Sequence, residues 1–152
     1  MKFSFHPILV TCLLLVAGFS VGTEAPAATT ALRVELTGLE SVEGELYIAV
    51  YDSDDTWLGD DTVLEQKVVI ADSREGELVT VELQLSPGEY ALSIFYDSND
   101  NGELDRNFIG IPKEPVALSN NAKAKFGPPK YKDAVFTLGA DPLTQRIDMH
   151  LI

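Results

Sequence analysis

Residues 79–96 read Val79-Thr80-Val81-Glu82-Leu83-Gln84-Leu85, then Ser86-Pro87-Gly88-Glu89, then Tyr90-Ala91-Leu92-Ser93-Ile94-Phe95-Tyr96. Apolar side chains occupy every second position on both sides of the Ser-Pro-Gly segment. This period of two is typical of a β-strand with one buried face, and Pro-Gly is a strong turn signal. The stretch therefore predicts two strands joined by a tight turn.

The same alternation recurs along the chain, whereas helical periodicity does not. The further strand candidates are residues 32–36, 46–50, 67–70, 134–138 and 147–151. Turn signals separate them, and about seven short strands in one chain are typical of two sheets packed face to face. We therefore predict an all-β protein, a single antiparallel β-sandwich of about seven strands covering residues 31–152.

The N-terminus has the pattern of an export signal. Met1-Lys2 precedes an apolar run over residues 8–16, and small residues follow from Ala17. The run is shorter than the roughly 20 residues that span a bilayer. We predict a signal peptide over residues 1–22, with cleavage as late as residue 27, and a flexible leader over residues 23–30. A retained membrane anchor and lipid attachment at Cys12 are the alternatives.

Charge and cysteine content exclude several classes of function. The chain has 24 acidic and 11 basic residues, a net charge of −13. Such a protein is unsuited to nucleic acid, which is bound by releasing counterions from phosphates with Lys and Arg. Acidity suits a divalent cation, although it also serves simple solubility. Because Cys12 is the one cysteine, the processed protein would lack disulfides and thiol chemistry.

The segment Asp97–Asp105 carries the most specific chemical pattern. Oxygen-bearing side chains fall at relative positions 1, 3, 5 and 9, with Gly102 at position 6. Calcium prefers six to eight oxygen ligands, and a glycine permits the sharp turn that a ligand loop needs. The predicted ligands of a structural calcium ion are Asp97, Asn99, Asn101, Asp105 and the backbone carbonyl of Glu103.

The loop departs from an EF-hand in two ways. Position 12 is Phe108 instead of a bidentate glutamate, and the preceding residues 90–96 form a predicted strand. A more distant group such as Glu114, or water, would have to complete the shell, and we expect modest affinity, nearer about 10⁻⁴–10⁻³ M. The alternative is a metal-free turn at Asn101-Gly102, since that dipeptide favours tight turns by itself.

Several motifs resemble the bacterial family called domain of unknown function 2141. They are Gly88-Glu89-Tyr90-Ala91, Tyr96–Asp105, Gly110-Ile111-Pro112-Lys113-Glu114, Ser119-Asn120-Asn121-Ala122, Phe126-Gly127-Pro128-Pro129 and Asp133-Ala134-Val135-Phe136. The similarity runs from about Leu32 to the C-terminus. It implies an exported protein of uncharacterised role and an immunoglobulin-like or prealbumin-like sandwich, and it supplies no catalytic mechanism.

Catalysis finds little support in the sequence. His6 lies in the predicted signal and His150 in the last predicted strand, so no triad with a histidine base can be assembled. We predict no catalytic residues and no cofactor other than calcium. The leading hypothesis is a non-enzymatic periplasmic or extracellular module that binds an unknown envelope or extracellular protein or glycan, without a stable membrane span after processing.

Two alternatives remain. The first is a carbohydrate-binding module that uses Trp57, in the acidic stretch Asp52–Asp61, together with loop tyrosines; Trp57 could equally pack onto the sandwich. The second is a small hydrolase with paired carboxylates, although no spacing nominates a pair.

Overall fold

The computed structural model describes residues 28–41, 43–123 and 127–150, and within them nine strands and three one-turn helices. The strands are β1 (Thr30–Thr37), β2 (Glu45–Tyr51), β3 (Leu64–Val69), β4 (Arg74–Glu75), β5 (Leu78–Leu85), β6 (Gly88–Asp97), β7 (Val116–Leu118), β8 (Phe136–Leu138) and β9 (Leu143–Asp148). The helices are α1 (Ile70–Ser73), the 3-10 turn η1 (Ser119–Asn121) and α2 (Tyr131–Ala134).

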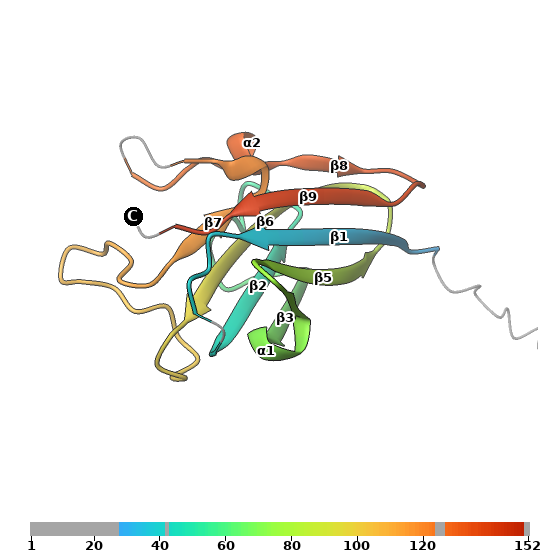
Figure 1. Cartoon of the computed structure of the whole chain (residues 1–152). Coiled ribbons are helices and arrows are strands. Elements are labelled where there is room, and N and C mark those ends of the chain that lie inside the picture. Colours follow the sequence, from blue (N-terminus) through green and yellow to red (C-terminus); the bar gives the residue numbers. More distant parts are fainter. Residues whose placement is uncertain (1–27, 42, 124–126, 151–152) are drawn as a thin grey trace, which may run out of the picture.

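The strands form two sheets. One sheet has the order β4-β5-β1-β9, and the other has the order β3-β2-β6-β7, with β8 paired to β6. In Figure 1 the β5-β1-β9 layer lies in front of the layer that contains β2, β3 and β6. The prediction of a mostly β protein is confirmed, and the two layers have a sandwich-like arrangement.

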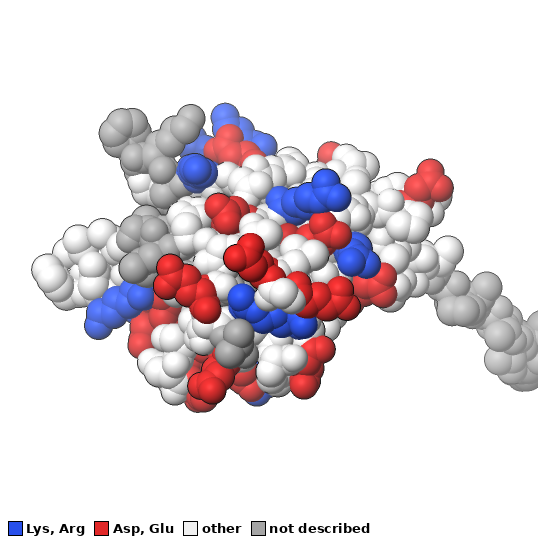
Figure 2. Space-filling view, viewed as in Figure 1, with Lys and Arg blue, Asp and Glu red and all other residues white. Residues whose placement is uncertain are grey.

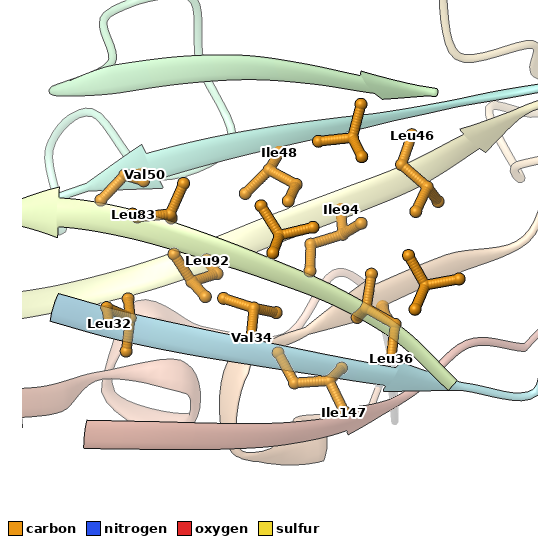
Figure 3. Packing of buried hydrophobic residues seen from close by; sticks show 14 of the residues in the cluster. Leu32, Val34, Leu36, Leu46, Ile48, Val50, Leu83, Leu92, Ile94 and Ile147 are labelled. Atoms are coloured by element: carbon orange, nitrogen blue, oxygen red, sulfur yellow. The ribbon is translucent and has the colours of Figure 1, made fainter. Parts of the chain in front are cut away.

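Both sheets bury one face in a shared core. The alternating side chains of β1, Leu32, Val34 and Leu36, are fully buried. In the other sheet, Leu46 and Ile48 of β2 and Ile94 of β6 are at most 1 % exposed. Figure 3 shows these side chains from β1 and from β2 and β6 directed into the space between the strands. The period of two places every second side chain on this face, so burial of apolar surface fixes the strand register.

Three expectations need correction. The described residues contain nine strands instead of about seven, because β4 has two residues and β7 has three, too few to show an alternating pattern. The strand pairing is not wholly antiparallel, since β1 pairs with β9 in parallel. The last strand is β9, Leu143–Asp148, instead of residues 147–151, because Gln145 occupies a half-buried position of the strand and hides the alternation.

The long connection after β6 is only partly irregular. It contains β7, η1 and α2, and Ser119 fastens it to the core. The buried Ser119 hydroxyl accepts a hydrogen bond from the Leu92 amide at 2.8 Å and donates one to the Ala134 carbonyl at 2.6 Å. Asn121 accepts from the Asp148 amide at 2.8 Å. The Ser119-Asn120-Asn121 motif therefore joins β6, α2 and β9, and the structure places it in a structural role.

The predicted signal peptide, residues 1–22, and most of the predicted leader lie outside the described residues. β1 begins at Thr30, one residue before the predicted start of the domain. Among the described residues, no helix has the length and apolar character needed to cross a membrane.

Candidate metal-binding loop

Asp97 ends β6 and organises the loop that follows it. Its side chain has no exposed surface. The Oδ2 atom accepts a hydrogen bond from the Gly102 amide at 2.7 Å, and Oδ1 accepts from the amides of Asn99 and Asn101 at 3.2 and 3.3 Å. Gly102 has φ +77°, a left-handed conformation that glycine adopts without strain. The loop therefore curls around one carboxylate.

The pKa of Asp97 reflects two opposing effects. Burial of the carboxyl acts to raise the pKa, whereas the backbone donors from Gly102, Asn99 and Asn101 act to lower it. The donors prevail, and the pKa lies below the ordinary value for aspartate. Asp97 is thus held as an anion, the form in which a carboxylate binds a metal ion.

Two other predicted ligands, Asn99 and Asn101, meet at Asp105. The side-chain amide of Asn99 donates to Oδ2 of Asp105 at 2.8 Å, and that of Asn101 donates to Oδ1 at 3.3 Å. The Oδ1 atom of Asn101 also accepts from the Glu103 amide at 2.8 Å. The structure therefore links all five predicted residues in one hydrogen-bonded loop, with Glu103 joined through its backbone.

Glu114 closes the base of the loop. It is 3 % exposed, and its Oε1 atom accepts hydrogen bonds from the amide and hydroxyl of Ser98 at 2.8 and 3.0 Å. Its Oε2 atom accepts from the Asp105 amide at 3.1 Å. Glu114 thus ties the two ends of the loop together, and a role as a calcium ligand would have to share oxygens that already serve these donors.

The donor set fits calcium only if uncharged oxygens take part. Among the described residues, no three His, Cys, Asp or Glu side chains are grouped so as to hold a metal ion. Phe108 is 98 % exposed and adds no ligand. The two carboxylates would therefore need the Asn99 and Asn101 amide oxygens and the Glu103 carbonyl, which are hard ligands of the kind that calcium accepts.

The connection after β6 also contains a turn that we did not predict from the sequence. Residues 106–113 form a compact turn centred on Asn107, whose Oδ1 atom accepts from the amides of Ile109 and Ile111, both at 3.0 Å. The Asn107 amide also donates to the Ile111 carbonyl at 2.9 Å. Asn with Gly110 three residues later is a turn signal that could have indicated it.

The comparison with known families covers most of the chain. A family model described as an uncharacterised protein conserved in bacteria, DUF2141, matches residues 34–146. The chain belongs to this family. No curated protein and no solved structure matches it. The matched range runs from β1 into β9 and includes the whole Asp97–Asp105 loop.

Trp57 lies within the same matched range and is packed onto the domain. Its indole nitrogen donates to the Pro129 carbonyl at 2.9 Å. Its ring makes edge-to-face contacts with Tyr51 and Tyr131, at centroid distances of 5.2 and 5.9 Å. These contacts join the acidic stretch Asp52–Asp61 to the segment before α2, which is the packing role that the sequence allowed.

A shallow groove of about 520 Å³ lies on the outer face of β2, β3 and β6. Tyr47 and Phe95 form part of its lining, and their rings stack at a centroid distance of 4.9 Å. Gly102, Leu104 and Arg106 reach it from the connection after β6. The candidate metal loop therefore borders an aromatic groove.

Proposed function

We propose that the protein is an exported, non-enzymatic β-sandwich module whose Asp97–Asp105 loop binds a structural calcium ion. The observation that carries this proposal is the convergence of Asp97, Asn99, Asn101 and Asp105 in one loop curled around a buried carboxylate. A bound cation would offset the conformational cost of ordering the loop and the repulsion between its acids.

Binding would need a small rearrangement. The amide NH₂ groups of Asn99 and Asn101 now donate to the Asp105 carboxylate. Rotation of each terminal amide by about half a turn would replace those nitrogens with oxygens, the ligand atoms that calcium requires. The rotation would also break the hydrogen bonds that the Oδ1 atoms of Asn99 and Asn101 accept from the amides of Asn101 and Glu103, and calcium binding would have to outweigh this loss. A cation between them would then supply the positive charge that the two NH₂ groups supply in its absence.

Thermal unfolding in EDTA and in millimolar calcium tests the proposal. Calcium at ten times its dissociation constant would add about 1.4 kcal/mol, which raises the melting temperature by several degrees. Asp97→Ala and Asp105→Asn should abolish the rise, and the second variant keeps the buried Asp97 carboxylate in place. Glu103→Gln is the matched control, because it removes one charge and leaves the carbonyl oxygen.

The rise in melting temperature with calcium is compared with the rise in magnesium. A rise that is specific to calcium and lost in both aspartate variants supports the site. Equal rises in magnesium and calcium at equal concentration, or a full rise in Asp105→Asn, would exclude this loop as the binding site.

Export is a separate part of the proposal. The apolar run over residues 8–16, after the basic start, supports it. Expression of the full chain in a bacterial host, with mass spectrometry of the protein in the periplasm and medium, tests it. We expect a mature N-terminus between residues 23 and 28; an intact Met1 in a cytoplasmic product would contradict the proposal.

The aromatic groove supports a second candidate function, glycan binding. Aromatic faces with polar groups beside them suit sugar rings, and Tyr47, Phe95 and Arg106 provide this combination. Binding of an oligosaccharide array by the wild type, and its loss in Tyr47→Ala but not in Trp57→Phe, would support the groove. We therefore propose Tyr47 and Phe95 as the glycan-binding surface instead of Trp57, whose ring packs against Tyr51 and Tyr131.

A further inference from the structure

The turn over residues 106–113, named here the apolar tip, presents large apolar side chains to solvent. Phe108 is 98 % exposed, Ile109 is 64 % exposed and Ile111 is 40 % exposed. In Figure 1 this part of the connection between β6 and β7 projects from the side of the two sheets. Scattered exposed apolar residues are ordinary, but three within four positions of a projecting turn form a patch.

The backbone of the apolar tip is held without help from these side chains. Besides the Asn107 hydrogen bonds, the Gly110 amide donates to the Asn107 carbonyl at 2.9 Å, and the Arg106 guanidinium donates to the Gly110 carbonyl at 3.2 Å. Lys113 donates its amide to the Asp105 carbonyl at 2.8 Å. The turn is therefore held by its backbone and polar groups, and within the described residues its apolar side chains stay exposed.

The apolar tip itself carries charge opposite to that of the molecule. Residues 106–113 contain Arg106 and Lys113 and no acid, in a chain of net charge −13. Figure 2 shows a white projecting lobe with blue atoms beside it at this position. The nearest acids in sequence, Asp105 and Glu114, form hydrogen bonds at the base of the turn. The combination of apolar and basic groups matches an anionic lipid surface.

We propose that the apolar tip inserts into the interfacial region of a membrane containing anionic lipids. Three side chains offer a few hundred Å², less than the roughly 800 Å² that each partner buries in a typical protein interface. Insertion into lipid needs no complementary surface and gains from each apolar group and each nearby cation. Acidic side chains elsewhere on the protein repel anionic lipid only weakly when they lie farther from it than the Debye length of about 10 Å.

This inference goes beyond the proposed calcium function and is independent of it. The hydrogen bonds that order the apolar tip involve residues 105–113 and no metal ion, and Asp105 contributes only its backbone carbonyl. Membrane binding should therefore persist in EDTA. If the calcium experiment failed, the membrane proposal would still stand. If the vesicle experiments failed, the calcium proposal would still stand.

A fluorescent reporter in the full-length chain tests the insertion. Phe108→Trp places an indole in the tip, and wild-type Trp57, which packs between Tyr51 and Tyr131, serves as the internal reference. With phosphatidylglycerol–phosphatidylcholine vesicles we expect a blue shift and quenching by brominated lipid in the variant beyond those of the wild type. Because the readout is local, binding through residues 8–16 cannot imitate it.

Matched variants measure the energetics by vesicle flotation. Phe108→Ser should weaken binding about tenfold or more. Lys113→Gln should weaken binding to anionic vesicles about fivefold and leave binding to pure phosphatidylcholine unchanged. Val63→Ser is the control, since Val63 is 45 % exposed and lies outside the tip.

Three outcomes would overturn the proposal. The first is an unshifted emission of the Phe108→Trp variant at millimolar lipid, and the second is an equal loss of binding in Val63→Ser. The third is Phe108-dependent binding to an envelope protein without any response to vesicles, which would assign the apolar tip to a protein partner.

Discussion

Asp97 ends a strand and also provides the acceptor for three amides of the next loop. Ser119 plays a comparable part at the other end of the long connection, where one hydroxyl serves two backbone groups. Each side chain is buried, so water cannot replace it if it is removed. Single substitutions at these positions should therefore have measurable effects on stability.

The lowered pKa of Asp97 predicts how stability depends on pH. The unfolded carboxyl titrates near pH 3.9, and the folded one titrates lower. The ionised form therefore adds stability above about pH 4, and this contribution is lost as the pH falls through the folded pKa. Asp97→Asn should lower the free energy of unfolding by about 1–3 kcal/mol at pH 7. The variant should then lose less stability than the wild type on acidification.

Guanidinium unfolding at pH 7 and pH 3, both in EDTA, measures this difference. Glu103→Gln is the control, because Glu103 is exposed and its carboxylate makes no hydrogen bond within the described residues. Parallel pH dependence of wild type and Asp97→Asn would show that the loop amides do not stabilise the anion.

Ser119→Ala should destabilise the domain by about 1–3 kcal/mol, because the Leu92 amide and the Ala134 carbonyl would both be left without a partner. Chemical denaturation measures the change. Ser93→Ala on the same strand as Leu92 is the control, since the Ser93 hydroxyl makes no hydrogen bond in the described part of the chain and should cost under about 0.5 kcal/mol. Equal effects would mean that the two hydrogen bonds contribute nothing net.

Among the elements, the strands with regular alternation could be predicted from sequence. β1, β2, β5 and β6 each show it, because one face of each is buried along most of its length. β7 could not be predicted, since three residues show no period and its position depends on pairing with β6. The parallel pairing of β1 with β9 joins distant segments, and no local pattern specifies a strand's partner.

In the candidate metal loop and the turn that follows it, some features could also be predicted from sequence and others could not. The spacing of Asp97, Asn99, Asn101 and Asp105 was sufficient to predict that they meet, because a short loop keeps neighbours close. The exposure of Phe108 was not predictable, since an apolar residue is expected to be buried unless the backbone around it turns outward. That turn depends on Asn107 accepting two amides. Asn107 and Gly110 could have indicated a turn here, but they do not specify that the Phe108 side chain points into solvent.

The junction of β1 with β9 provides a test at this scale. Gly38 follows β1 with φ +80°, and an added Cβ would collide with the Met149 carbonyl oxygen. Gly76 also has a positive φ, +65°, but a Cβ there would meet nothing within 4 Å. Gly38→Ala should therefore lower the melting temperature clearly more than Gly76→Ala, which bears only the backbone strain of about 1–2 kcal/mol. Equal effects would show that the β9 end moves aside freely.

At the scale of the whole molecule, the net negative charge affects stability whether or not a metal ion is bound. Removal of residues 1–27 would leave the net charge at −13, because Lys2 and Glu24 cancel. In the part of the chain that the structure describes, three ion pairs offset part of this charge on the outer faces of the sheets: Arg33–Glu35, Arg146–Glu35 and Lys67–Glu45. Most acids are left to repel one another, which destabilises a compact state.

Simple salt should therefore stabilise the protein without any metal site. Raising sodium chloride from about 0.02 to about 0.5 M shortens the Debye length severalfold and weakens the repulsion between acids, so the melting temperature in EDTA should rise. Sucrose at the same osmolality is the control for effects on water. A constant or falling melting temperature would mean that the ion pairs matter more than the net charge. Because calcium also screens charge, its specific effect is the part that exceeds magnesium at equal ionic strength and disappears in Asp105→Asn.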